Sequence, residues 1–279
     1  MRVDKALRCW FYAAVNLTWL TAASAVPVPF PQLPPEVQKG IQAELKGGTV
    51  GEIEREEEDG KVAYTFEINR SGKSIDYTLN EAGAVVSVEV TLFETPPAVH
   101  KTIEAQIGQS AVESIDKTFE DGKVTYEVDW KSKDGAEHSF TVLEDGKLDS
   151  VQFILGETPP AIQAAITKEA AGAPVKEISK TFEDNVATYD VTVNRGGADR
   201  DFRVAENGTL ESRQVLLTEV PPAAQKTIQQ TIGNGKIVQI DQSFEKKMGV
   251  FPFEVEGVKD GKPFNFSVGP KGRFLGMDE

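Results

Sequence analysis

The spacing of hydrophobic positions changes in a regular cycle along this chain. Stretches with apolar residues three or four positions apart predict helices, and stretches with alternating apolar and polar residues follow them and predict half-buried strands. The clearest strand alternates four apolar with four polar residues: Val124, Tyr126, Val128 and Trp130 with Lys123, Thr125, Glu127 and Asp129. Because such alternation puts one strand face in a core and the other in water, the pattern predicts helices packed on antiparallel sheets.

The cycle occurs four times. Pro-Pro pairs begin at Pro34, Pro96, Pro159 and Pro221, spaced 62, 63 and 62 residues apart. A fixed period of this kind indicates internal duplication. It predicts four tandem repeats at residues 33–94, 95–157, 158–219 and 220–279.

Each repeat begins with a short predicted helix. The apolar stripes are Val37, Ile41 and Leu45; Val99, Ile103 and Ile107; Ile162, Ile166 and Ala170; Ala224, Ile228 and Ile232. Thr95 and Thr158 precede the prolines and are predicted N-caps, and glycines follow all four stripes. A helix with one apolar stripe is expected to bury that stripe against another element, such as a sheet.

Four strands are predicted after each helix. The fold class is therefore α+β, in which each repeat packs a short helix on one face of a four-stranded antiparallel sheet. A unit of this size is only marginally stable alone, so neighbouring repeats are expected to pack together. The fourth repeat departs from the pattern, because Pro252 falls inside its second predicted strand and indicates an edge or a bulge there.

Residues 1–25 are typical of a secretory signal peptide. Arg2, Lys5 and Arg8 precede a short apolar stretch, and Ala23-Ser24-Ala25 fits a signal-peptidase site. We expect cleavage after Ala25 and an exported protein in the periplasm or outside the cell; the alternative is an uncleaved membrane anchor. Residues 26–32 are rich in proline and predict an extended, non-helical lead-in.

Charge and composition exclude several classes of protein. The 279 residues carry a net charge of −14, which becomes −16 without residues 1–25, so nucleic-acid binding is disfavoured. One cysteine and two histidines exclude a disulfide framework and a Cys/His zinc cluster.

The repeats resemble a known family. The second copy carries the motif most fully, in Ile115, Phe119, Asp121-Gly122-Lys123, Tyr126-Glu127-Val128 and Asp145-Gly146-Lys147-Leu148. This unit is similar to the PepSY-like, beta-lactamase-inhibitor-like repeats of bacterial exported proteins, over about residues 33–279. The resemblance implies a helix on an antiparallel sheet, and binding or inhibition rather than catalysis. The first copy departs from the motif, with Glu57 where the others have phenylalanine.

The sequence predicts no catalytic, cofactor-binding or metal-binding residues. His100 is expected on a solvated helix surface and His138 at a strand start, and neither recurs in other copies. The acidic run from Glu52 to Asp59 fits a solvated strand and turn, with a calcium or cationic-partner site as the alternative. Asn207-Gly208-Thr209 fits a glycosylation sequence, but a turn explains it equally.

Recurring aromatic residues are expected in the cores: Tyr64, Tyr126, Tyr189 and Phe253. Trp130 is the exception, because it comes at the end of its strand. We expect it at the rim, as a candidate anchor for a partner.

The sequence favours an exported, non-catalytic binding or inhibitory module. It would present an acidic antiparallel-sheet surface to a protein or cell-envelope component with a basic face, and after signal cleavage no membrane span is expected. Two alternatives stay open at this point. One is an exported hydrolase with a site between repeats, and the other is a purely structural envelope spacer.

Overall fold

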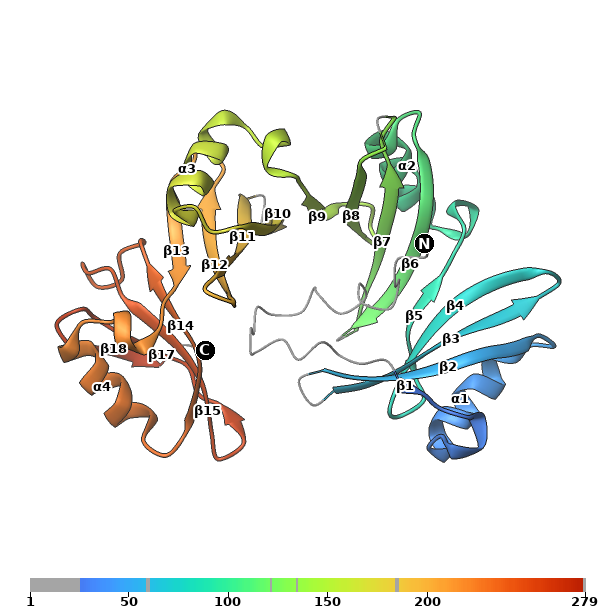
Figure 1. Ribbon diagram of the computed structural model, residues 1–279, viewed down its shortest axis with the longest axis horizontal. Coiled ribbons are helices and arrows are strands. Elements are labelled where there is room, and N and C mark those ends of the chain that lie inside the picture. Colours follow the sequence, from blue (N-terminus) through green and yellow to red (C-terminus); the bar gives the residue numbers. More distant parts are fainter. Residues whose placement is uncertain (1–25, 59–60, 121, 134, 184–185, 278–279) are drawn as a thin grey trace. The chain divides into compact units, whose positions relative to one another are not determined.

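The computed structural model describes residues 26–58, 61–120, 122–133, 135–183 and 186–277. Within these ranges the chain forms two compact units, residues 26–151 (unit 1) and residues 152–277 (unit 2). Each unit contains two α-helices and antiparallel strands (Figure 1). The predicted signal peptide and the Asp59-Gly60 turn lie outside the described residues.

Unit 1 pairs its strands in chain order, each antiparallel to the next. Its helices are α1 (Pro35–Leu45) and α2 (Pro97–Ile107). Its strands are β1 (Val26–Pro27), β2 (Thr49–Glu58), β3 (Lys61–Arg70), β4 (Lys73–Asn80), β5 (Val85–Glu89), β6 (Ala111–Glu120), β7 (Lys123–Lys131), β8 (Glu137–Leu143) and β9 (Leu148–Gln152).

Unit 2 follows the same plan, with helices α3 (Pro160–Ala170) and α4 (Pro222–Ile232). Its strands are β10 (Val175–Glu183), β11 (Val186–Arg195), β12 (Ala198–Ala205), β13 (Leu210–Gln214), β14 (Lys236–Ser243), β15 (Phe253–Lys259), β16 (Lys262–Pro263), β17 (Phe266–Val268) and β18 (Phe274–Met277). The α+β class and the order of a helix followed by antiparallel strands are confirmed.

Within each unit, one continuous sheet runs through two helix-and-strand groups. In unit 1, β5 pairs with β6 and places Ser87 opposite Thr118. In unit 2, β13 pairs with β14 and places Ser212 opposite Ser243. The last strand of the first group therefore has no exposed edge, because the first strand of the next group pairs with it. An exposed edge could otherwise pair with another chain and cause aggregation.

Each helix covers one face of the strands that follow it. Val37 and Ile41 of α1 are fully buried and share a core with Tyr64, Phe66 and Ile68 of β3. The other three helices build equivalent cores. The four aromatic residues predicted to lie in the cores are buried, as expected: Tyr64, Tyr126, Tyr189 and Phe253.

Two predictions about the repeats are wrong. Thr95 does not cap α2, because the N-cap is Pro96; the Thr95 hydroxyl instead donates to the Leu92 carbonyl oxygen at 2.7 Å and closes a 3-10 turn. Thr158 does the same before α3. Pro252 precedes β15 rather than interrupting it, so the extra residues of the fourth copy lie in the connection between β14 and β15.

The lead-in covers the edge of β2, as β5 covers the edge of β6. Val26–Pro27 pairs with β2, and the Val28 amide donates to the Ile53 carbonyl oxygen at 2.8 Å. Val90 makes the same bond to Ile115 at 2.8 Å. The extended prediction fails at Phe30–Gln32, a 3-10 turn, because Pro31 falls where no helical N–H is needed.

Candidate functional site

The strands of each unit turn a polar face away from the helices. In β7, Tyr126 and Val128 point into the core under α2, so Thr125, Glu127 and Asp129 lie on the opposite face. We call this the open face of each sheet. It is the polar face that the alternation predicts.

Five carboxylates stand opposite one another on five neighbouring strands of the unit 1 open face. In the register of β3 and β4, Glu67 lies opposite Asp76, and the register of β4 and β5 places Asp76 opposite Glu89. Glu89 lies opposite Asp116 where β5 adjoins β6, and Asp116 lies opposite Glu127 in β7. We call these five residues the acidic ladder. With strands about 4.8 Å apart, the ladder is about 19 Å long.

The row continues beyond the ladder into two hydroxyl groups. Glu127 is opposite Thr141, and Thr141 is opposite Ser150. Both hydroxyl residues are buried, at 3% and 0% exposure, and neither hydroxyl oxygen has a hydrogen-bond partner among the described residues. Leaving such a group unsatisfied costs about 1–3 kcal/mol.

The equivalent row of unit 2 contains fewer carboxylates. Its members, in strand order from β11 to β15, are Thr192, Asp201, Gln214, Asp241 and Glu254. The two rows therefore occupy the same strand positions but differ in charge. The side-chain amide oxygen Oε1 of Gln214 is buried without a partner in the part of the chain that the structure describes.

Burial and nearby like charges raise the pKa of two carboxylates of the unit 2 row, Asp241 and Asp201. Burial is the main reason that the pKa of Asp241 rises to about 6; the carboxylates of Glu256, Glu254 and Asp201 raise it too, against a hydrogen bond from Gln239 that lowers it. Burial also raises the pKa of Asp201, although the Thr192 hydroxyl donates to its carboxylate at 2.7 Å. Burial therefore favours the protonated, neutral forms of Asp241 and Asp201.

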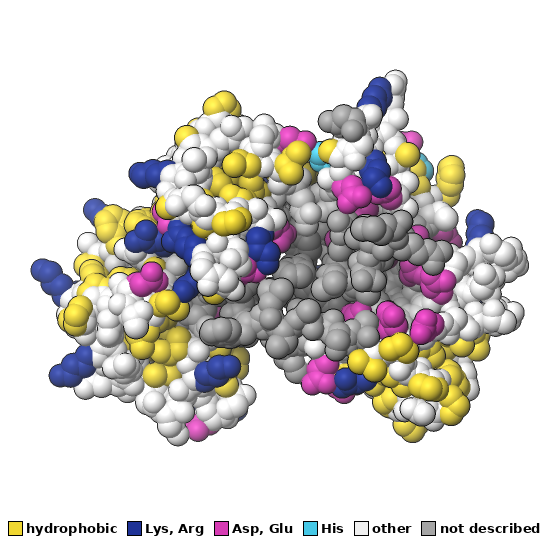
Figure 2. Space-filling model, in the orientation of Figure 1, with side chains coloured by type: hydrophobic (Ala, Val, Ile, Leu, Met, Phe, Trp, Pro, Cys, Tyr) yellow, Lys and Arg dark blue, Asp and Glu magenta, His cyan; other side chains and the backbone are white. Residues whose placement is uncertain are grey.

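The acidic excess belongs mainly to unit 1. Residues 26–151 contain 25 Asp and Glu against 12 Lys and Arg, a net charge of −13. Residues 152–279 contain 18 against 15, a net charge of −3. Figure 2 shows the same contrast on the face in view, with acidic side chains denser on unit 1 and basic side chains spread over unit 2.

The acidic run of β2 is an exposed strand end. Glu52 and Glu57 are exposed, and Arg55 forms an ion pair with Glu57 at 2.6 Å. Asp59 lies outside the described residues. Across the described ranges no three Asp, Glu, His or Cys side chains are arranged to hold a metal ion.

Trp130 lies at the end of β7 on the side of the helix, away from the acidic ladder. Its ring is half-buried against the core under α2 and stacks on His138 with centroids 4.6 Å apart. His100 is less solvated than expected, because its Nδ1 lies 3.1 Å from the Leu92 carbonyl oxygen and its Nε2 lies 3.4 Å from Glu104. The structure brings neither histidine into the ladder.

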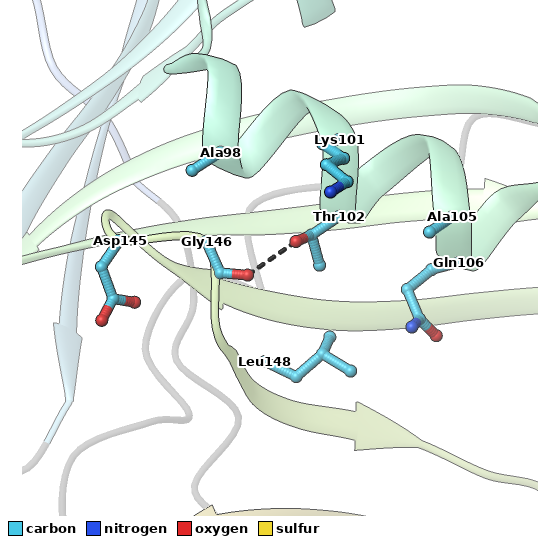
Figure 3. Close-up of a pocket in the computed structure, with 8 residues that line it drawn as sticks. All are labelled: Ala98, Lys101, Thr102, Ala105, Gln106, Asp145, Gly146 and Leu148. Carbon is cyan, nitrogen blue, oxygen red and sulfur yellow. Dashed lines mark hydrogen bonds between the residues drawn. The ribbon is translucent and has the colours of Figure 1, made fainter.

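A hollow of about 460 Å³ lies between α2 and the turn that precedes β9 (Figure 3). Ala98, Ala105 and Gly146 line it with small side chains or none, and Lys101 and Asp145 also line it. The Thr102 hydroxyl donates to the Gly146 carbonyl oxygen at 2.6 Å. Thr102 carries the one hydroxyl group among the lining residues, and this bond uses it to hold α2 against the turn. The hydroxyl therefore has a structural role.

The acidic ladder was not predicted. Its members come from two copies, and their alignment depends on the pairing of β5 with β6. The available signal was the position of Asp76 and Glu127, each adjacent to a buried tyrosine in an alternating strand. Comparing such positions across the copies would have found part of the row.

Comparison with known families gives one match. Residues 6–86 match the family described as "Putative beta-lactamase-inhibitor-like, PepSY-like". The resemblance expected from the repeats is confirmed over this segment. No curated protein matches the chain.

Several solved structures resemble this chain at low identity. A DUF2874 family protein from Bacteroides ovatus is 14% identical, with 43% of this chain and 86% of that chain covered and a TM-score of 0.33. A BLIP-like protein from Bacteroides fragilis is 15% identical, with 43% and 84% covered and a TM-score of 0.32. A protein from Bacteroides eggerthii described as "putative periplasmic" is 18% identical, with 44% and 89% covered and a TM-score of 0.34.

None of the helices in the described part of the chain combines the length and the apolar character that crossing a bilayer needs.

Proposed function

We propose that this chain is an exported, non-catalytic binding or inhibitory module. Its open sheet face binds a protein or cell-envelope component that presents a basic surface. The acidic ladder is the observation that carries the proposal, because it concentrates like charge on a broad, regular surface. A surface of this kind suits a protein interface better than a small ligand, which needs a concave apolar pocket.

Repetition supports binding over catalysis. We infer four tandem repeats with the bounds predicted above, since the order of one helix and several strands recurs in both units. Repeated elements provide extended surface, whereas catalysis needs one asymmetric group of residues. Hydrolase profiling with ester, peptide and glycoside substrates tests the enzyme alternative, and reproducible turnover would overturn this proposal.

Export is supported by the basic start and the Ala23-Ser24-Ala25 site. We expect cleavage after Ala25 and a mature chain in the periplasm or outside the cell. N-terminal sequencing of the exported protein checks this. An intact Met1 in a membrane fraction would instead identify the segment as an anchor.

Crosslinking and capture from envelope extract test the binding function. The mature chain serves as bait at low and at high salt, since screening shortens electrostatic reach to about 8 Å at physiological ionic strength. We expect a specific partner with a basic face whose capture falls with salt. A chain that enriches nothing at either salt concentration would fit a structural spacer.

Trp130 is proposed as a separate anchor at the rim of unit 1. Its partial exposure and its stack on His138 present a rigid aromatic surface. Trp130→Ala is expected to weaken partner binding while the thermal unfolding transition stays cooperative. If Trp130→Ala unfolds the second repeat, or if the folded variant binds the partner as tightly as the wild type, the ring belongs to the core alone.

A further inference from the structure

We infer that the acidic ladder of unit 1 is the subsite for an extended, basic segment of the partner protein. The inference deepens the proposed binding function and rests on it. It specifies where on the chain the partner binds and what form the bound segment takes. The ladder is formed by Glu67, Asp76, Glu89, Asp116 and Glu127.

The ladder places like charges directly opposite one another, an arrangement that destabilises a sheet. The fold does not require this arrangement. At the equivalent positions of unit 2, Thr192 replaces Glu67 and Gln214 replaces Glu89, and the sheet continues unbroken. A feature that the fold can do without, and that costs stability, is typical of a functional site.

The two buried hydroxyl groups at the end of the ladder give a second, independent indication of a ligand. Thr141 and Ser150 extend the same row on the next two strands, and their oxygens have no partner among the described residues. An arginine or lysine side chain supplies N–H donors for such oxygens and for carboxylates. A basic ligand therefore has the donors that both parts of the row need.

The dimensions of the ladder favour a peptide over a single metal ion. The strands that carry neighbouring carboxylates are about 4.8 Å apart, and the whole ladder is about 19 Å long. A calcium ion, in contrast, binds oxygens that all lie within about 2.6 Å of the ion. An extended segment rises about 3.3 Å per residue, so about six residues span the ladder. Alternate side chains then face it, which places about three basic groups against five carboxylates.

The test uses the full mature chain and a fluorescein-labelled peptide, Arg-Ser-Arg-Ser-Arg-Ser-Arg, in an anisotropy titration at about 150 mM salt. The ladder variant combines Glu89→Gln with Asp116→Asn. The control variant combines Asp241→Asn with Glu254→Gln, which makes the same change in charge at the equivalent row of unit 2. We expect about tenfold weaker binding for the ladder variant and less than about twofold for the control.

A third variant, Thr141→Val, changes no charge. We expect it to keep or raise the thermal midpoint, because it removes a buried unsatisfied hydroxyl, and to weaken peptide binding about threefold. This variant separates a built subsite from general attraction to an acidic protein. It also keeps the inference testable if the ladder variant folds poorly.

Four results would overturn the inference. Equal weakening by the ladder and control variants would show diffuse attraction, and unchanged binding in both would remove the ladder from the interface. Stoichiometric calcium binding that is lost in the ladder variant, without peptide binding, would assign a metal site instead. If wild type and ladder variant capture the same partner equally, the ladder assignment fails while the proposed binding function stands.

Discussion

The Thr102 hydroxyl donates a hydrogen bond of 2.6 Å to the carbonyl oxygen of Gly146, and this bond ties α2 to the turn between β8 and β9. Unit 2 repeats the contact, with Thr227 donating to Gly272 at 2.7 Å. The approach is close because the turn residue has no side chain. A Cβ atom on Gly146 would lie 2.8 Å from Ala98.

Gly146→Ala is expected to destabilise the chain by about 2–4 kcal/mol, because it adds a clash with the helix to the strain of an alanine at φ +87°. Gly72→Ala is the matched control, since Gly72 has φ +81° and a Cβ atom there would meet nothing within 4 Å. We expect about 1 kcal/mol for the control. Urea unfolding measures both, and equal losses would refute the role of close approach.

The amide of Val28 is expected to hold the lead-in on the sheet. Val28→Pro removes the donor of the 2.8 Å bond to Ile53 and should cost about 1–2 kcal/mol of stability. Val28→Ala keeps the amide and removes only part of a half-buried side chain. Hydrogen exchange of β2 amides should therefore rise more in the proline variant than in the alanine variant, and the opposite order would contradict the covering role.

The helices and cores were predictable from the sequence because each carries its own local signal. Val37 and Ile41 lie one turn apart and are both fully buried, and the alternation around Tyr126 fixed the core face of β7. Helix capping was not predictable in the same way. Thr95 has a favourable residue type for a cap, but the 3-10 turn before it fixes its hydroxyl elsewhere.

The acidic ladder required the pairing of strands, which no local pattern contains. Glu89 and Asp116 belong to different copies and become neighbours only when β5 pairs with β6. A slip of one residue in that register would turn every side chain of the strand to the other face. The charge count predicts an acidic protein, but it does not show that five carboxylates lie in one row. That arrangement follows only from the register of the paired strands.

The raised pKa of Asp241 predicts that stability increases on mild acidification. The folded-state value of about 6 lies above the ordinary 3.8, so the folded chain binds the proton first as pH falls. Stability should therefore rise from about pH 7 to about pH 4, by about 1–3 kcal/mol from this group. Asp201, whose pKa is raised by burial, acts in the same direction.

Asp241→Asn should stabilise the chain at pH 7 and flatten its pH dependence between about pH 4 and 6. Asp260→Asn is the matched control, because Asp260 is an exposed turn residue. Thermal midpoints at several pH values measure both variants. Stability that falls steadily from pH 7 to pH 5 in the wild type, or the same gain in the control, would contradict the burial of this carboxyl.

Gln214→Glu should build a second ladder on unit 2. The substitution places a carboxylate between Asp201 and Asp241, so that four carboxylates stand on neighbouring strands through Glu254. We expect lower stability by several tenths of a kcal/mol, from added like-charge pairs, and two bound Arg-Ser peptides per chain instead of one. Gln230→Glu adds the same charge at an exposed position of α4 and should leave the stoichiometry at one. Isothermal titration calorimetry decides the outcome: if Gln214→Glu also keeps a single site, a row of aligned carboxylates is not sufficient for binding, and the ladder of unit 1 must depend on its neighbouring hydroxyl groups.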